Sequence, residues 1–122
     1  MRPPIEFTSL KGNAMEVKRV IAIIRSEALE ALEEKLKSLH VGGVTVSRVK
    51  GYGEYKNLFT SDWMIQRTKV EIFIEASEVD ELIDAMLDIA RGDVPGAGVV
   101  AVLPVERFLH LRTGTETLPP RA

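Results

Sequence analysis

The 122-residue chain contains no cysteine, which excludes disulfide bonds and thiolate metal sites. No run of apolar residues reaches the roughly 18 positions that a membrane-spanning helix requires. The formal net charge is only −2, so the chain has no general electrostatic attraction to nucleic acid or to a membrane surface. The N-terminus also lacks the long apolar core of a signal peptide. These absences favour a cytoplasmic protein that neither binds nucleic acid nor inserts into a membrane.

Histidine is scarce, and no catalytic set stands out. His40 and His110 are distant in the sequence and have no cysteine beside them, so their spacing does not predict a metal site. The carboxylates of Glu71 and Glu75 share one face of a predicted strand, but no nucleophile with a base accompanies them. The sequence therefore favours a protein without catalytic residues, and a weak nucleotide hydrolase is the least supported alternative.

What the chain does contain is an ordinary apolar content of 45%, arranged in alternating strand and helix patterns. Apolar residues at every second position predict strands, and leucines at helical spacing predict helices. The predicted elements are strands at residues 17–24, 44–50, 70–74, 99–103 and 108–113 and helices at residues 27–39 and 79–90. This order predicts an α+β, ferredoxin-like βαββαβ sandwich with a short fifth strand.

One connection in this scaffold is unusually long. Between the second and third predicted strands, residues 51–67 far exceed the roughly two to five residues of an ordinary hairpin loop. This stretch contains the only tryptophan and both tyrosines, which predicts a functional loop. Tyr55, Phe59 and Trp63 are candidates for contact with a partner, because aromatic side chains dominate binding hot spots. Trp63 could instead pack against its own assembly.

The ends of the chain have a different character from the domain between them. Residues 1–14 contain two prolines and no periodicity, which predicts an irregular leader. The predicted domain extends over residues 15–114. Residues 115–122 are polar and contain proline, which predicts a flexible tail.

Four stretches make the chain resemble the PII signal-transduction family over residues 17–114: VKRVIAIIR, GGVTVSRVKGYG, TKVEIFIEASEVDELIDAM and VVAVLPVERFLHLRTG. The resemblance implies a homotrimer without catalytic turnover or a permanently bound cofactor. It also implies that adenine nucleotides bind as effectors in the clefts between subunits. Residues 51–67 match the family's T-loop, which docks on a partner protein, and residues 92–98 match its B-loop.

The resemblance also assigns roles position by position. The B-loop residues can present backbone N–H groups to a phosphate. The assigned nucleotide-binding residues are Ile23 and Phe73 as apolar walls, Glu71 beside the adenine, Thr45, Gly51 and Gly53 in the cleft lining, Gly96, Ala97, Gly98 and Val99 in the B-loop, and Arg67, His110 and Arg112 near the phosphates.

Two departures from the family's pattern weaken the implied phosphate site. Val99 stands where the family has a phosphate-binding lysine, and His110 stands where it has the first of two arginines. Histidine is mostly neutral at pH 7, so two cationic contacts are missing. Because a triphosphate carries the most charge, ADP or AMP is predicted to bind better than ATP. Alternatively, a nearby lysine or arginine compensates for these losses, and His110 is simply accommodated in its strand.

The implied T-loop departs from the family as well. Tyr55 replaces a glutamine that helps to hold Mg-ATP with 2-oxoglutarate, and the RGAEY stretch with the modified tyrosine is absent. These changes resemble a divergent subgroup associated with carboxysomes, which pairs ADP or AMP with bicarbonate. Backbone N–H groups at Gly51 and Gly53, together with Lys56 or Arg67, could hold that anion. The implied partner is then a transporter of inorganic carbon or a protein of carbon metabolism.

Two other functions remain open at this point. One is a conventional nitrogen regulator that responds to ATP and 2-oxoglutarate. The other is a trimeric metal-tolerance protein of the CutA type, which shares the architecture. The RTG ending, the VKGYG stretch and the lack of cysteine argue against the second alternative.

Overall fold

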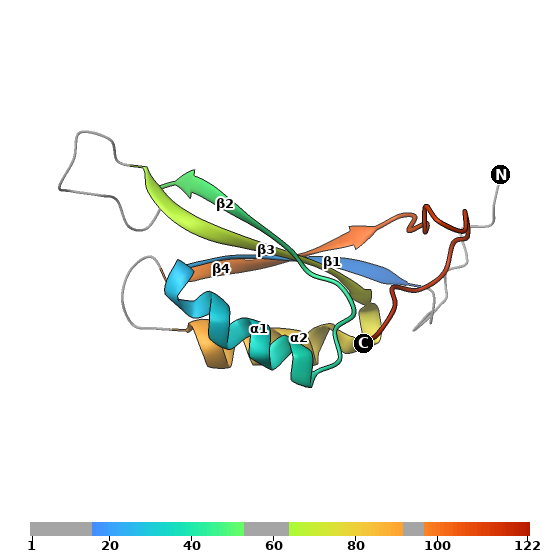
Figure 1. The fold of residues 1–122 in the computed structure, drawn as a ribbon, viewed down its shortest axis with the longest axis horizontal. Helices are drawn as coiled ribbons and strands as arrows, with labels where there is room; N and C mark the ends of the chain where they lie inside the picture. Colours follow the sequence, from blue (N-terminus) through green and yellow to red (C-terminus); the bar gives the residue numbers. More distant parts are fainter. Residues whose placement is uncertain (1–15, 53–63, 92–96) are drawn as a thin grey trace.

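The structure is a computed structural model that describes residues 16–52, 64–91 and 97–122. Within these residues, two helices cover one face of a four-stranded antiparallel sheet, and no helix covers the other face (Figure 1). The elements are β1 (Val17–Ile24), α1 (Leu29–Ser38), β2 (Thr45–Gly51), β3 (Ile65–Glu75), α2 (Val79–Ala90) and β4 (Gly98–Val105), with a short 3-10 turn before each helix. The strand order β2-β3-β1-β4 confirms the predicted ferredoxin-like fold.

The core lies between the sheet and the helices. In the register of β1 and β3, Val20 lies opposite Ile72 and Ala22 lies opposite Val70, and all four side chains are buried. The helices contribute the buried side chains of Leu32, Leu36, Val79, Leu82, Ala85 and Met86. Because successive residues of a strand point to opposite faces, the intervening residues of β1 and β3 lie on the helix-free face.

Strands β2 and β3 continue past the other two strands as a two-stranded arm (Figure 1). The last residue of β1 pairs with Thr68, whereas the pairing of β2 with β3 extends to Gly51 opposite Ile65. Gly51 and Arg67 therefore belong to strands, and the predicted loop over residues 51–67 is too long. The connection between the two strands consists of residues 52–64, of which 53–63 lie outside the described residues.

The predicted fifth strand over residues 108–113 is wrong. His110 and Thr115 form an isolated bridge around a tight turn, in which the N–H of His110 donates to the Thr115 carbonyl at 2.8 Å. The N–H of Gly114 donates to the His110 carbonyl at 2.7 Å. Gly114 has a φ of 70°, and this left-handed conformation reverses the chain before a strand can extend.

The sequence predicts a flexible tail over residues 115–122, whereas the structure docks its last residues on the loop that follows α1 (Figure 1). The N–H of Ala122 donates to the His40 carbonyl at 2.9 Å. The carbonyl of Pro120 approaches Gly42 so closely that a Cβ on this glycine would lie 2.0 Å from its oxygen. These contacts are made by main-chain atoms. The polar and proline-containing composition of the tail therefore does not predict them.

Candidate functional site

The residues that the resemblance places beside the adenine come together on the helix-free face. Thr45 lies directly opposite Glu71, and Phe73 is two residues further along β3 on the same face. Arg19 of β1 lies opposite Phe73, and its guanidinium forms an ion pair with the Glu71 carboxylate. The predicted acidic contact is thus already neutralised by a residue that the sequence did not single out. The two-residue alternation of side chains along β1 could have indicated the involvement of Arg19, because it puts Arg19 on the same face as Ile23.

A second group of predicted residues lies where the arm leaves the sheet. Ile23 and Val99 are directly opposite each other across β1 and β4, and Val99 is 64% exposed. Gly98 precedes Val99 with a φ of 125°, and a Cβ on it would lie 2.1 Å from the Ile23 carbonyl oxygen. Only glycine fits this approach, so Gly98 has a structural role at the start of β4. Ala97 is the first described residue before it.

The structure brings together two of the four residues predicted to hold bicarbonate. Arg67 lies opposite Val49 in β2, and Gly51 is two residues beyond Val49 on the same face. Such diagonal neighbours are about 7–8 Å apart, close enough for one small anion to reach both. The predicted site residues that lie outside the described part of the chain are Gly53, Tyr55, Lys56, Phe59, Trp63 and Gly96.

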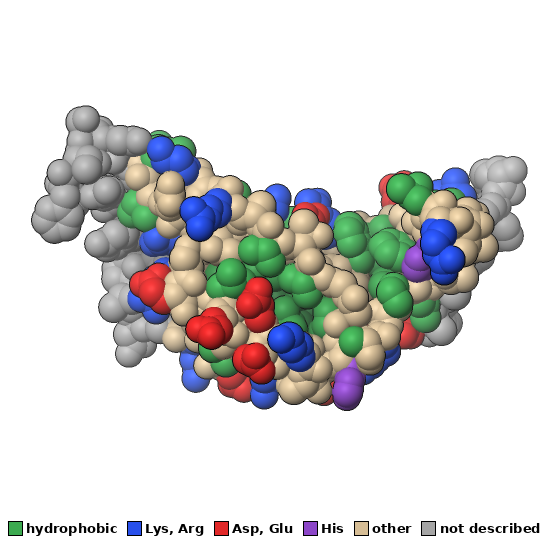
Figure 2. Space-filling view, viewed as in Figure 1, with side chains coloured by type: hydrophobic (Ala, Val, Ile, Leu, Met, Phe, Trp, Pro, Cys, Tyr) green, Lys and Arg blue, Asp and Glu red, His purple; other side chains and the backbone are tan. Residues whose placement is uncertain are grey.

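The arm is strongly basic. Lys50 of β2 and Arg67 of β3 lie on it, Arg48 and Lys69 lie where it joins the sheet, and the stretch of β2 from Thr45 to Gly51 has no acidic residue. Figure 2 shows lysine and arginine side chains over this part of the molecule and acidic side chains gathered lower down, over the helices. Although the net charge of the whole chain is only −2, the arm and its junction with the sheet carry a local excess of positive charge.

His110 and Arg112 lie at the opposite end of the sheet. Phe108 packs against Phe73 with ring centroids 5.4 Å apart, and the His110 ring meets Phe108 edge-on at 5.2 Å. The Nε2 atom of His110 is 3.2 Å from the Leu118 carbonyl oxygen. Arg112 lies exposed in the turn that follows. The histidine ring is therefore held by an aromatic contact and a carbonyl within its own segment.

The two groups of predicted phosphate contacts do not meet within one chain. Val99 and Val105 are six residues apart along β4, which corresponds to about 20 Å of extended strand. His110 and Arg112 follow Val105 and pack near the row of Phe73, not near Val99. A nucleotide that contacts both groups would therefore have to lie between two copies of the chain.

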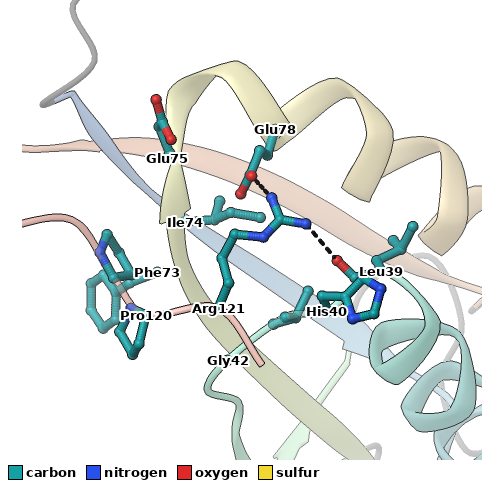
Figure 3. Close-up of a pocket in the computed structure, with 11 residues that line it drawn as sticks. Leu39, His40, Gly42, Phe73, Ile74, Glu75, Glu78, Pro120 and Arg121 are labelled. Carbon is teal, nitrogen blue, oxygen red and sulfur yellow. Dashed lines mark hydrogen bonds and ion pairs between the residues drawn. The ribbon is translucent and has the colours of Figure 1, made fainter.

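The tail creates a small pocket of its own at that end of the sheet. Figure 3 shows Arg121 between Glu78, with which it forms an ion pair, and the Leu39 carbonyl, to which it donates at 3.2 Å. Pro120 lies on the side of Phe73. The cavity of about 20 Å³ admits roughly one water molecule, which is far too little for a nucleotide.

A further ion pair supports the C-terminal segment before the tail. Arg107 donates from Nε and Nη2 to the two carboxylate oxygens of Glu116 at 3.2 and 3.0 Å. This hydrogen bonding, and then the negative charge of Glu116, raises the pKa of Arg107 above its ordinary value. The pair closes the turn that contains His110 and Arg112.

Within residues 16–52, 64–91 and 97–122, no group of three or more histidine, aspartate or glutamate side chains is placed to hold a metal ion. Neither helix in the same ranges combines the length and the apolar character that crossing a bilayer demands.

Comparison with known proteins gave consistent matches. The family described as nitrogen regulatory protein P-II matches residues 17–115. The nitrogen regulatory protein P-II of Microchaete diplosiphon is 34% identical over 106 residues, covering 80% of this chain and 94% of that protein. The corresponding protein of Pasteurella multocida is 32% identical over 107 residues, covering 82% and 96%. The crystal structure of Arabidopsis thaliana PII bound to citrate superimposes with a TM-score of 0.72 and 31% identity, covering 83% of this chain and 88% of that one.

Proposed function

The chain belongs to the P-II family of nitrogen regulatory proteins, whose members are signalling regulators and not enzymes, and we propose that it is a homotrimeric sensor of adenine nucleotides. ADP or AMP binds between subunits in preference to ATP. The observation that carries this proposal is the separation of Val99 from His110 and Arg112 by the length of β4. One chain supplies only part of the site, and a neighbouring chain completes it.

The helix-free face supports assembly. Ile21, Ile23 and Phe73 present apolar surface there, and Phe73 remains 38% exposed although Phe108 packs on it. Covering apolar surface stabilises an assembly by about 25 cal/mol for each Å² removed from water. The main charged pair on this face, Arg19 with Glu71, is internally neutralised, so its burial at an interface costs less than that of an isolated charge.

The preference for fewer phosphates follows from the charges near the phosphate positions. Val99 offers no cation, and the His110 ring is already engaged by Phe108 and the Leu118 carbonyl. Arg67 and Arg112 remain as permanent cations. Hydrogen bonds to charged groups contribute roughly 1.5–3 kcal/mol each, so losing such contacts reduces affinity most for the most highly charged ligand.

The proposed co-effector is bicarbonate, held at the arm by Gly51 and Arg67. Effector binding changes the conformation of the loop over residues 51–67. This loop then contacts a partner, which we take to be a transporter of inorganic carbon reached from the cytoplasm. The diagonal placement of Gly51 and Arg67 on one face supports the anion site. The related Arabidopsis PII is described as bound to citrate, which is a carboxylate anion, although citrate is larger and more highly charged than bicarbonate.

A second candidate is open to the same test. The relatives are named nitrogen regulatory proteins, which favours a conventional regulator that responds to ATP with 2-oxoglutarate. Membership of the P-II family leaves the CutA-type alternative without support.

Calorimetry with purified protein distinguishes these functions. AMP, ADP and ATP with Mg²⁺ are titrated alone, with bicarbonate and with 2-oxoglutarate, and light scattering measures the oligomeric state. The proposal predicts a trimer, tighter binding of ADP or AMP than of ATP, and an additional effect of bicarbonate in the presence of ADP. Tightest binding of ATP with 2-oxoglutarate would favour the conventional regulator. A monomer, or no binding of any adenine nucleotide, would overturn both functions.

Two arginines of the C-terminal segment provide a matched pair of variants for this test. Arg112→Gln removes a cation that is assigned to the phosphates, whereas Arg107→Gln removes one that is engaged by Glu116. We expect the first to weaken ADP binding by about tenfold or more, and the second, which loosens the turn but keeps the Arg112 charge, to weaken it by much less. An equal loss in both variants would mean that the shape of the segment matters and that the charge of Arg112 does not.

A further inference from the structure

We infer that Lys69 contacts the phosphates of the bound nucleotide and supplies the positive charge that Val99 lacks. No role is assigned to Lys69 by the resemblance to the family. The inference rests on the proposed function, because it concerns the same nucleotide site. It is carried by the position of Lys69 in the sheet and by the absence of an ion-pair partner for it among the described residues.

The first argument is the register of the strands. Lys69 of β3 lies opposite Ile23 of β1, and Ile23 lies opposite Val99 of β4. All three side chains are on the helix-free face, and two strand spacings separate Lys69 from Val99 by about 10 Å. A lysine side chain that lies along Ile23 covers much of this gap. An ammonium group on such a side chain can reach toward the space above Val99, where an uncharged side chain stands.

The second argument is the order of residues along β3. On the helix-free face the strand presents Arg67, Lys69, Glu71 and Phe73 in succession, about 6.6–6.8 Å apart. Glu71 and Phe73 are assigned to the adenine and Arg67 to the phosphates. A nucleotide laid along the strand with its base at Glu71 and Phe73 extends its phosphates over Lys69 before they reach Arg67.

The third argument is the distribution of charge. The nearest carboxylate on the same face is Glu71, and Arg19 already forms an ion pair with it. Lys69 itself makes no ion pair with any residue in the described ranges, although its side chain is only partly exposed. A partly covered ammonium group without a counterion favours an anionic ligand, and lysine binds phosphate as a point charge.

This role is compatible with the proposed preference for ADP or AMP. The chain lacks two cations, at Val99 and at His110, and Lys69 replaces one of them. The arrangement along β3 places Lys69 nearer to the base than Arg67. Lys69 is therefore expected to serve the phosphates closest to the ribose, which ADP and ATP share, and it adds nothing specific to the third phosphate.

The test compares two variants that each lose one positive charge, on neighbouring strands where the arm joins the sheet. Lys69→Met removes the proposed contact. Arg48→Met is the matched control, because Arg48 lies on the neighbouring strand opposite Thr68 and points to the other face. For ADP we expect Lys69→Met to lose about ten- to a hundredfold in affinity and Arg48→Met to change it by less than about threefold. Adenosine, which has no phosphate, should bind both variants equally.

Two further variants keep the test independent of folding. Lys69→Arg preserves the charge and should retain most of the affinity for ADP. Val99→Lys in the Lys69→Met background places a cation at an exposed position on the same row, so it should restore ADP binding. Light scattering and thermal unfolding verify that each variant is still assembled and folded.

The outcomes separate this inference from the proposed function. If the unmodified protein binds no adenine nucleotide, the proposed function is overturned and the role of Lys69 with it. If the unmodified protein binds ADP and the two charge-loss variants behave alike, only the role of Lys69 is overturned. A loss of adenosine binding as large as that of ADP would also overturn it, because the effect would then not arise at a phosphate.

Discussion

At the end of the sheet where β1 finishes, β2 and β3 continue as a basic arm, and Lys69 has no ion-pair partner among the described residues. At the end where β1 begins, the C-terminal segment returns to the domain, and two of its arginines are paired with carboxylates. Arg107 binds Glu116, and Arg121 binds Glu78. At the first end, Lys69 thus lacks an ion-pair partner within the described residues, whereas at the second end two ion pairs hold the C-terminal segment together and to the domain.

This difference distinguishes Lys69, which is available to an anionic ligand, from Arg107 and Arg121, which stabilise the C-terminal segment. A cation without an internal partner gains most from an anion that arrives from solution, whereas a paired one must first lose its partner. Near the arm, Gly98 packs closely against the backbone of Ile23 in the neighbouring strand. At the other end, the docked tail packs against the loop that follows α1. Substitutions at glycines of the two ends should therefore differ in what they disrupt.

The largest effect is expected at Gly98, where the arm leaves the sheet. In Gly98→Ala the new Cβ meets the Ile23 carbonyl oxygen at 2.1 Å, and alanine must also adopt a φ of 125°. Both partners belong to paired strands, so neither can move without breaking β1–β4 hydrogen bonds. We expect the free energy of unfolding to fall by about 3 kcal/mol, measured by urea denaturation at fixed protein concentration.

Gly51→Ala is the matched control for this substitution. Gly51 also lies in a strand at the arm end, but a methyl group added to it would meet no atom within 4 Å, and its φ is not left-handed. We expect it to be neutral or to stabilise by about 0.5 kcal/mol, because alanine loses less backbone entropy on folding than glycine. Comparable losses in both variants would show that the close approach at Gly98 is not what matters.

Gly42→Ala tests the other end, with a smaller expected effect. The new Cβ would lie 2.0 Å from the Pro120 carbonyl oxygen, but here the obstructing segment is a terminal one that can leave. The loss is then limited to the contacts of the tail, about 1–2 kcal/mol. Carboxypeptidase should digest the variant faster than the unmodified protein. Gly43→Ala, whose methyl would meet no atom within 4 Å, should be digested at the original rate. Equal rates for all three proteins would contradict the docked tail.

Much of the fold could be predicted from the sequence, because it depends on periodic burial. The alternation of Val70, Ile72 and Ile74 predicts the buried face of β3, and the leucines at 32 and 36 predict the buried stripe of α1; the structure confirms both. The fifth strand and the loose tail could not be judged in this way. Their conformation depends on a left-handed glycine at 114 and on single backbone contacts, such as that of Ala122 with His40, which leave no repeating pattern.

The site is predictable to a more limited extent. Resemblance to the family located Thr45, Glu71 and Phe73, and the structure places them together on one face. It could not indicate that Arg19 neutralises Glu71, because an ion pair between strands depends on register. For the same reason, the lysine that could compensate for Val99 can be identified only from the structure. There, Ile23 of β1 lies between Val99 and Lys69 in one row of the sheet.

The smallest expected effect, and one of opposite sign, lies in the turn to which the tail docks. His40 follows α1 and has a φ of 61°. At this helix end, the N–H of Val41 donates to the Leu36 carbonyl at 3.2 Å, and the N–H of His40 donates to the Lys37 carbonyl at 3.0 Å. This is the hydrogen-bond pattern of a Schellman motif, in which glycine is the preferred residue at the left-handed position. His40→Gly should therefore stabilise the protein by about 0.5–1 kcal/mol in urea denaturation.

The same substitution sharpens the comparison between the two ends, because it leaves the tail contact intact. The carbonyl that accepts the N–H of Ala122 belongs to the backbone of residue 40 and is retained in His40→Gly. Digestion of His40→Gly by carboxypeptidase should thus remain slow while its stability rises. In Gly42→Ala, by contrast, digestion should become faster and stability should fall. His40→Ala is the control, since alanine keeps the cost of a left-handed φ and should give little gain. A loss of stability in His40→Gly would mean that the imidazole ring contributes more to this turn than its strained backbone costs.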